Sequence, residues 1–286
     1  SAARNAGIAA TRTDLTLLMD ADIYLGKTCL QKLVLAYRQH SAVICPRIVF
    51  YAQPETIQCD GTSAHFIGTL ILHNNLCSIN EIPRKIIAVG GCPSACLLIE
   101  TEIARRLGGF DETYFFYFED LEFDLKLRSN GQTVLCEPDA VVLHDVGRGT
   151  SELSYRSGQK YPSQRFYLTI RNRLMTIFTY YRLRTIFLLL PAFVLYETAS
   201  LMAAIRRGWL LEWLHAWRWQ IENQKALRSK RKQRQSSRCL GDRDIMMGGP
   251  LPISKGFIQS TIARILLHFL SSTTNYYWQL IKKKID

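Results

Sequence analysis

The stretch "LTLLMDADIYL" (residues 15–25) is a short apolar run that ends in two acidic residues. An apolar run that stops at an acid is typical of a buried strand in a parallel sheet. Asp20 and Asp22 flank Ala21 at the point where ligands gather in open α/β sheets, beyond the carboxyl ends of the strands. Two carboxylates one residue apart can share a divalent cation that also holds a diphosphate, because Mg²⁺ prefers oxygen ligands. The alternative is a solvated Asp turn, since Asp-x-Asp is a short and common pattern.

Helix and strand patterns alternate around this stretch, through residues 1–150. An Ala-rich start, apolar residues at helical spacing and a Gly pair that suits a helix end predict helices. Runs of apolar and β-branched residues predict strands. The alternation implies an α/β fold with a mainly parallel sheet. The predicted helices cover residues 2–11, 27–40 and 101–109, and the predicted strands cover 15–20, 42–51, 95–100 and two segments of 132–144 around Pro138.

Composition excludes a disordered chain and a disulfide scaffold. The chain has 286 residues, of which 48% are hydrophobic and 11% aromatic, enough for one large or two small domains with an ample core. Its eight cysteines are scattered without a CxxC pair. This pattern suits reduced cytosolic thiols better than a disulfide framework or a zinc site.

Charge divides the chain into two parts. Residues 1–150 hold 13 Lys and Arg against 17 Asp and Glu, whereas residues 151–286 hold 23 against 7. An acidic first half joined to a basic second half indicates that the two halves have different functions. Basic charge alone is compatible with nucleic acid or with an anionic membrane surface.

A second acidic cluster lies in "YFFYFEDLEFDLKLRSNG" (residues 114–131), where aromatic residues surround Glu119, Asp120, Glu122 and Asp124. Carboxylates among aromatic side chains are costly unless they are paired, bound to metal or used in chemistry. Asp124 can pair with Lys126 or Arg128. Glu119 and Asp120 have a simpler alternative as the acidic first turn of a helix.

Together these segments resemble the family 2 glycosyltransferases, which have the nucleotide-sugar-binding GT-A fold. Each segment is a weak match, but their order and spacing agree over nearly all of residues 1–150, and bacterial rhamnosyltransferase-like members are the most similar. The matching segments are "AARNAGI" (2–8), "LTLLMDAD" (15–22), "VGGCPSACLLIE" (89–100), "LGGFDETYFFYFEDLEFDLKLR" (107–128) and "AVVLHDVGRGT" (140–150).

The resemblance implies roles for the acids. Asp120 would be the general base, with Glu119 orienting it or the acceptor, and the neighbouring aromatic residues would exclude water. Asp20, Asp22 and His144 would hold Mg²⁺ or Mn²⁺. A lone His is otherwise more often a hydrogen-bonded core residue.

The resemblance also implies where the two substrates bind. The nucleoside-diphosphate sugar would contact Arg4, Asn5, Gly7, Asp20, Ala21 and Asp22. The acceptor would contact Gly91, Phe116 and Glu119. Helix capping is the alternative for Arg4, Asn5 and Gly7, and a plain turn is the alternative for Gly90 and Gly91.

The sequence departs from the family pattern in three places. Glu122 stands where Asp is more common, and Lys126 stands where Arg is usual. Lysine lacks the planar guanidinium with which arginine binds a carboxylate through two hydrogen bonds. The strands with which such enzymes open, including the one whose acid contacts the base, have no counterpart here. We therefore expect a catalytic GT-A domain over residues 1–155 that lacks its first strands.

Residues 156–286 are predicted to be helical and to associate with a membrane. "TIFLLLPAFVLYETASLMAAI" (185–205) is long enough to span a bilayer, although Pro191 and Glu197 interrupt it. Basic residues and four Trp residues follow, including "LRSKRKQRQSSR" (227–238), which suits anionic headgroups. We expect an in-plane or re-entrant association, with a spanning one left open, and the alternative is a buried helix that packs on the catalytic domain. The last segment, "ARILLHFLSSTTNYYWQLIKKKI" (263–285), is predicted to be a further interfacial helix.

The expected function is inverting, metal-dependent transfer of a sugar from a nucleoside diphosphate to a lipid-linked or cell-surface glycan, at the cytoplasmic face of the cell membrane. Rhamnose is the sugar that the resemblance favours. A catalytically inactive glycan-binding relative is one alternative. A nucleic-acid-binding protein is a weaker one, because the first half is acidic where such a platform should be basic. No nucleic-acid partner is expected.

Overall fold

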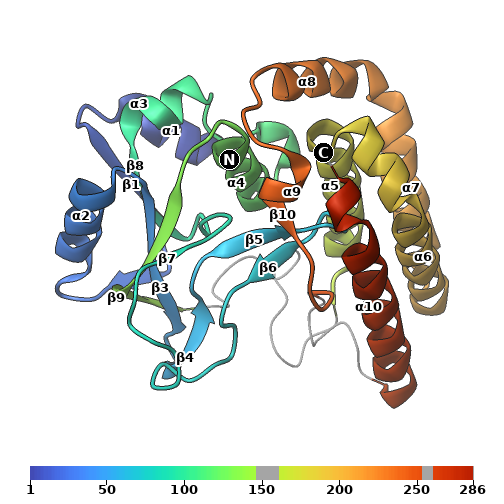
Figure 1. Cartoon of the computed structure of the whole chain (residues 1–286), viewed down its shortest axis with the longest axis horizontal. Helices are drawn as coiled ribbons and strands as arrows, with labels where there is room; N and C mark the ends of the chain where they lie inside the picture. Colours follow the sequence, from blue (N-terminus) through green and yellow to red (C-terminus); the bar gives the residue numbers. More distant parts are fainter. Residues whose placement is uncertain (146–160, 253–259, 286) are drawn as a thin grey trace. The chain divides into compact units, whose positions relative to one another are not determined.

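The computed structural model describes residues 1–145, 161–252 and 260–285 (Figure 1). The chain forms two compact units. Unit 1 comprises residues 1–64 and 70–148, and unit 2 comprises residues 65–69 and 149–286. The predicted boundary between residues 155 and 156 lies outside the described residues, so it stays a prediction.

Unit 1 is built around a seven-stranded sheet (Figure 1). Five strands follow the order β1-β8-β3-β9-β2, while β4 pairs with β3 and β7 pairs with β9. A short β5–β6 hairpin stands outside this sheet. The strands are β1 (Leu15–Met19), β2 (Ile23–Leu25), β3 (Val43–Phe50), β4 (Gln53–Cys59), β5 (Thr62–His65), β6 (Leu70–Leu72), β7 (Ile87–Ala88), β8 (Cys96–Glu100) and β9 (Val134–His144).

The prediction of a mainly parallel sheet is wrong, because the sheet is mixed. Among the described strands of this sheet only β3 and β9 pair in parallel, and the other pairs are antiparallel. The apolar runs misled the prediction, since burial on both faces produces such runs whatever the strand direction. All of β3 except its last residue is buried, although β8 runs antiparallel to it on one side.

Helices cover both faces of the sheet, which explains that burial. One core cluster joins the sheet to Ile8, Ala104 and Phe123, and a second cluster joins it to Leu33 and Ala36. The first three belong to α1 (Ala2–Ala10), α3 (Thr101–Arg106) and α4 (Glu119–Ser129), and the other two belong to α2 (Cys29–His40). These elements confirm the α/β class and the predicted helices of the first half.

Residues 132–144 do not form two strands around Pro138. They contribute one strand, β9, with a register shift against β3, where Pro46 pairs with Glu137 but Arg47 pairs with Val141. Pro138 lies in the displaced part, because proline has no N–H to donate to a ladder and is accommodated at bulges.

A buried ion pair ties β3 to the turn after β4. Arg47 donates from Nε and Nη2 to the two carboxylate oxygens of Asp60 at 2.8 and 2.7 Å. Both side chains are 1% exposed. Asn74 adds a hydrogen bond to Asp60 Oδ2 at 2.9 Å. The paired geometry compensates the desolvation of the two charges, and removal of one partner would leave the other charge buried.

Unit 2 is helical, which confirms that part of the prediction. Within it α5 packs against α7 and α8, and α6 packs against α7 and α10 (Figure 1). Pro191 lies inside α6 and does not end it. Its elements are α5 (Ser163–Tyr180), α6 (Leu183–Arg207), α7 (Leu210–Glu222), α8 (Gln224–Ser236), α9 (Asp242–Ile245), β10 (Met246–Met247) and α10 (Thr261–Ile281).

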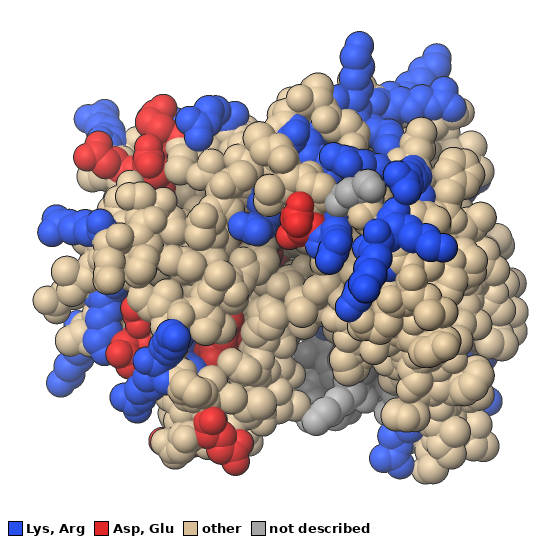
Figure 2. All heavy atoms as spheres, viewed as in Figure 1, with Lys and Arg blue, Asp and Glu red and all other residues tan. Residues whose placement is uncertain are grey.

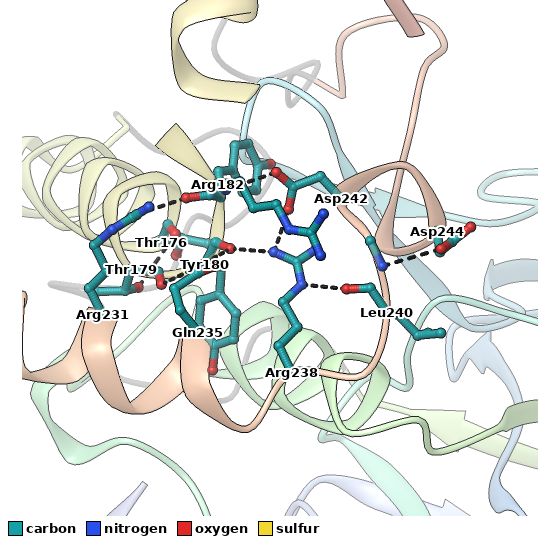
Figure 3. A network of polar contacts seen from close by, with 12 residues as sticks. Thr176, Thr179, Tyr180, Arg182, Arg231, Gln235, Arg238, Leu240, Asp242 and Asp244 are labelled. Atoms are coloured by element: carbon teal, nitrogen blue, oxygen red, sulfur yellow. Dashed lines mark hydrogen bonds and ion pairs between the residues drawn. The ribbon is translucent and has the colours of Figure 1, made fainter. Parts of the chain in front are cut away.

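Basic side chains of α8 and the loop after it cap the C-terminal end of α5 (Figure 3). Arg231 donates to the carbonyls of Phe178 and Tyr181, and Gln235 and Arg238 both donate to the carbonyl of Tyr180. The last carbonyls of a helix have no intrahelical partner and carry partial negative charge, so cationic donors suit them. Part of the basic charge of α8 therefore stabilises the C-terminal end of α5.

The buried Arg47–Asp60 pair gives the first prediction. Arg47→Met should lower the free energy of unfolding by ~3–5 kcal/mol, because Asp60 would stay buried without its cation. Arg218→Met is the matched control, since Arg218 and Glu222 form an exposed pair with side chains 73% and 52% exposed, and should cost less than ~1 kcal/mol. Urea unfolding measures both changes, and equal losses would contradict a special role for the buried pair.

Candidate active site

Arg4 links the two acidic segments that the sequence singled out. From α1, its Nη2 contacts Asp20 Oδ1 at 2.6 Å, just beyond the end of β1. Its Nη1 lies 3.6 Å from Glu119 Oε1, at the start of α4. The backbone N–H of Asp20 donates to the carbonyl of Ala95 at 2.9 Å, which fixes the end of β1 beside the loop before β8. Three elements distant in sequence therefore present their charged groups at one point.

The aromatic segment before α4 is strained. Phe115, Tyr117 and Phe118 have φ angles of 58°, 62° and 66°, in the left-handed region that bulky side chains rarely adopt. Such conformations cost ~1–3 kcal/mol each and cluster at functional sites. Phe118 is the N-cap of α4 and makes no side-chain capping bond, so Glu119 and Asp120 enter the first helical turn directly. The strained residues therefore lie directly before the two acids, Glu119 and Asp120.

Glu119 and Asp120 have oxygens available for a ligand. Glu119 Oε2 and Asp120 Oδ1 are buried atoms that make no hydrogen bond within the described part of the chain. Buried polar atoms are nearly always paired, so an orphan oxygen indicates a group reserved for a substrate or an ion. A pure helix-capping role would not require either oxygen to be withdrawn from water.

Burial shifts the proton affinity of both acids. It raises the pKa of Glu119 to about 7, and the charge of Asp120 adds to this effect while Arg4 opposes it. Burial also raises the pKa of Asp120, again against the charge of Arg4. The pKa of Arg4 is raised as well, because Asp120 and Asp20 outweigh the opposing effect of its burial. Carboxyl groups whose pKa is raised above the usual range bind a proton more strongly, which suits general-base catalysis.

Asp22 and His144 form a second pair. They meet because β2 pairs antiparallel with β9, which sets Ile23 opposite His144. His144 Nε2 lies 3.5 Å from Asp22 Oδ1. His144 Nδ1 hydrogen-bonds Gln58 Oε1 at 2.8 Å, and a carbonyl oxygen can only accept, so this bond leaves Nε2 as the lone-pair nitrogen.

A divalent cation fits these residues in part. A carboxylate and an imidazole that is oriented by an outer hydrogen bond are suitable donors, and Mg²⁺ commonly takes one or two carboxylates plus substrate phosphates. Asp20 is directed to Arg4 instead, and the described residues contain no group of three or more His, Cys, Asp or Glu side chains that could hold a metal ion. The joint metal role of Asp20, Asp22 and His144 stays a prediction.

The predicted donor residues have different environments. Asn5 uses its amide to bond the backbone of Phe110 in both directions and also donates to Glu112, so it holds the loop after α3. A Cβ at Gly7 would meet nothing within 4 Å, so no steric demand explains this glycine. Ala21 is exposed in the turn between β1 and β2. Their contacts with a donor stay predictions.

The predicted acceptor residue Gly91 has a structural reason to be glycine. A Cβ there would lie 1.9 Å from Asp124 Cγ. Asp124 Oδ1 accepts from the backbone N–H of Cys92 at 2.8 Å, and Asp124 Oδ2 accepts from the Thr62 hydroxyl at 2.6 Å. Burial raises the pKa of Asp124 well above its usual range. Phe116 stacks edge-on against Tyr117 at 4.6 Å. Acceptor binding by Gly91 and Phe116 stays a prediction.

Asp124 does not pair with Lys126 or Arg128 as the sequence suggested. Lys126 pairs instead with Glu122 at 3.2 Å, because side chains four apart share a helix face and side chains two apart do not. Arg128 is four residues from Asp124 but donates to the carbonyl of Gln132 at 3.0 Å. Sequence reasoning also missed Gln58 as the partner of His144. Nothing in the local sequence signals Gln58, since it acts through a strand pairing.

Comparison with known proteins shows a partial match to one family. Residues 1–95 match the model described as glycosyl transferase family 2. The pre-mycofactocin glycosyltransferase of Mycobacterium tuberculosis H37Rv is 30% identical over 146 residues, which cover 51% of this chain and 30% of the relative. The N-acetylglucosaminyl-diphospho-decaprenol L-rhamnosyltransferase of the same strain is 37% identical over 62 residues, which cover 22% of this chain and 20% of the relative.

The chain thus spans less than a third of the length of these family 2 relatives. A solved structure, GalNAc-T7 with UDP, GalNAc and Mn²⁺, superposes with a TM-score of 0.50 at 14% identity and covers 70% of this chain and 37% of its own. At that identity the likeness concerns the fold, which is an α/β fold with a mixed sheet resembling GT-A. The predicted resemblance to family 2 is therefore confirmed for the matched residues, together with the fold at this level.

The raised pKa of Glu119 gives a stability prediction. Its stabilising contribution is complete below the unfolded pKa of 4.5 and is lost as the pH rises through about 7, because the folded protein then holds a buried carboxylate. The free energy of unfolding of Glu119→Gln minus that of the wild type should therefore be ~2–3 kcal/mol larger at pH 8 than at pH 4.5.

Urea unfolding at the two pH values checks this. The exposed Glu102 provides the control, since Glu102→Gln should change the free energy by less than ~0.5 kcal/mol at either pH. A Glu119→Gln variant whose difference from the wild type is the same at pH 4.5 and pH 8 would refute the shift.

Proposed function

We propose that this protein transfers a sugar, with inversion, from a nucleoside-diphosphate donor to a hydroxyl group of a glycan. One observation carries the proposal. Glu119 and Asp120 present carboxylate oxygens without a hydrogen bond close to Arg4 and Asp20, which belong to the segment that matches family 2. The UDP in the structure of GalNAc-T7 supports a nucleotide-sugar donor.

Asp120 acts as the general base. Its carboxylate takes the proton of the acceptor hydroxyl as the acceptor oxygen attacks the anomeric carbon, and the bond from that carbon to the diphosphate oxygen breaks. The leaving diphosphate keeps the electron pair of that bond. Attack from the side opposite the leaving group inverts the anomeric centre. Glu119 holds the acceptor or Asp120 in place, and the strained aromatic segment limits access of water to the reacting atoms.

Arg4 tunes the base. Its charge favours the ionised form of both acids, so that Asp120 remains able to accept a proton despite burial. Arg4 also holds Asp20 at the end of β1, and Asn5 fixes the loop after α3. Arg4, Asn5, Gly7, Asp20, Ala21 and Asp22 would line the donor side, and Gly91, Phe116 and Glu119 the acceptor side.

Mg²⁺ or Mn²⁺ would be held by Asp22 and His144, with Asp20 as a further ligand if it leaves Arg4. A bound cation supplies positive charge to the diphosphate. The hydrogen bond from His144 to Gln58 keeps the imidazole oriented toward Asp22.

The acceptor is proposed to be a lipid-linked or cell-surface glycan, at the cytoplasmic face of the cell membrane. The name of the rhamnosyltransferase relative, which specifies a diphospho-decaprenol acceptor, supports a lipid-linked substrate. It also supports rhamnose as the first sugar to test. The helix α6, which is long and apolar enough to cross a membrane, supports work at a lipid surface.

The test uses the full chain, a panel of nucleotide sugars and lipid-linked acceptors, and Mn²⁺ or Mg²⁺. Asp120→Asn keeps the shape of the side chain but cannot take the proton, so turnover should fall ~10²–10⁴-fold. Donor affinity measured by calorimetry should stay near wild type, because Asp120 is assigned to the acceptor proton. Asp22→Ala should instead abolish metal-dependent donor binding.

Asp111→Asn is the matched control, because Asp111 caps a short helical turn in the same segment through a side-chain oxygen that Asn retains. It should change turnover by less than ~3-fold. Near wild-type turnover of Asp120→Asn, with folding checked by circular dichroism, would mean that the base lies elsewhere.

A further inference from the structure

One face of α6 is apolar and uncovered. Phe187, Leu190, Val194, Met202 and Ile205 are exposed, from 48% to 72%. At 100° per residue they fall within one arc of the helix. Only 17% of the most apolar 18-residue window of α6 is buried in the structure. Uncovered apolar surface on this scale marks an interaction site, since monomeric soluble proteins rarely expose it.

The polar groups of α6 do not interrupt this face. Glu197, which is costly in an apolar phase, pairs with Arg173 of α5 at 2.8 Å, and the Arg173 side chain is only 2% exposed. Thr198 lies on the apolar face, but its hydroxyl donates to the carbonyl of Val194 at 2.8 Å within the same helix. Between Phe187 and Ile205 the exposed arc of α6 therefore presents no charged side chain.

α10 has a second apolar stripe. Ile262, Leu266, Phe269, Tyr276 and Leu280 are exposed, from 57% to 73%, and follow helical spacing. Its opposite side buries Leu270, Thr274, Trp278 and Ile281. A helix that is apolar on both sides is stable where the second side also leaves water. Among the described helices only α6 is apolar enough to cross a membrane by composition, whereas the sequence of the last segment predicts an interfacial helix.

The two helices run in opposite directions along each other. Tyr277 near the end of α10 donates to the carbonyl of Leu188 near the start of α6, at 2.7 Å. Cationic residues therefore lie at both ends of the pair, with Arg182, Arg184 and Lys282–Lys284 at one end and Arg206, Arg207 and Arg264 at the other. At 1.5 Å per residue, α6 and α10 are ~37 and ~31 Å long.

Further cations lie on a separate face of α8. Lys225, Arg228 and Lys232 are exposed at a spacing of three and four residues, whereas Leu227 and Arg231 face α5. In Figure 2, Lys and Arg side chains gather where α8 lies, while the surface over α6 shows few charges in this view. An apolar face beside a cationic face is the pattern that binds anionic lipid surfaces.

We propose that α6 and α10 are two lipid-inserted helices, which lie in the plane of one bilayer leaflet with their apolar stripes among the acyl chains. The exposed cations of α8 would meet anionic headgroups. This proposal deepens the membrane part of the proposed function, on which it rests, and it names α10 as a second inserted element.

The neighbour of α6 favours an in-plane position over a spanning one. α7 begins three residues after α6 ends, beyond Gly208 in the left-handed conformation, and folds back to pack along α6. It carries the exposed Arg218 and Glu222 at 73% and 52%. If α6 crossed the bilayer, these charges would lie within the hydrocarbon region, which is costly. Along a leaflet they stay on the aqueous side.

The test is flotation of the purified full chain with preformed phosphatidylcholine vesicles, with and without 30% phosphatidylglycerol. Two double variants place charges on the stripes, Phe187→Glu with Val194→Glu on α6, and Leu266→Glu with Phe269→Glu on α10. Each should lower the partition coefficient ~100-fold or more, because burial of two such side chains in an apolar phase drives the binding. Lys225→Gln with Arg228→Gln and Lys232→Gln should weaken only binding to the anionic vesicles.

Leu30→Glu with Leu35→Glu is the matched control, since these α2 side chains in unit 1 are 47% and 54% exposed and should not affect flotation. Wild-type flotation of the α10 variant would overturn the role of α10. If the stripe variants convert a dimer to a monomer by sedimentation without lipid, and leave flotation unchanged, a second copy covers these faces and the proposal is wrong. Asp120→Asn should float like the wild type, so loss of transfer and loss of insertion are separable.

Discussion

The ion pair between Arg4 and Asp20 is the interaction on which the candidate site depends. It joins the first helix to the end of β1, and the same guanidinium reaches Glu119 at the start of α4. Without that positive charge, Asp20, Glu119 and Asp120 would bring three carboxylates together with no compensation, and mutual repulsion would protonate or separate them. Arg4 thus makes it possible for the fold to keep a base ionised in a partly buried place.

A second constraint places the residues around that base. The segment 115–118 is held in left-handed conformations so that α4 can begin with its two acids, and Asp124 one turn further anchors the Gly91–Cys92 loop and Thr62. Gly91 is required because Asp124 occupies the space that a side chain would need. The strained residues before α4 and the buried Asp124 within α4 together fix the first turn of this helix against the loop that precedes β8.

The sequence reveals local patterns well and long-range pairings poorly. Helices and strands of the first half follow from apolar spacing, and the ordered motifs identify the family. Strand direction does not follow, because a strand buried on both faces has the same composition whichever way it runs. The meeting of Asp22 with His144 depends on the β2–β9 register, and the contact of Asp124 with Thr62 joins residues 62 positions apart. The last segment is predicted from its sequence to be an interfacial helix, but which of its apolar side chains are exposed is seen only in the structure.

The pH dependence of transfer tests the role of Arg4 most directly. In the wild type, kcat/KM should rise with pH through an acidic limb that lies above the usual carboxyl range, since burial raises the pKa of both Asp120 and Glu119. Arg4→Gln should move this limb to higher pH, because the charge that favours both carboxylates is gone, whereas Arg4→Lys should keep it close to the wild-type position. An acidic limb that stays in place in a folded Arg4→Gln enzyme would contradict the claim that Arg4 sets the ionisation of the catalytic acids.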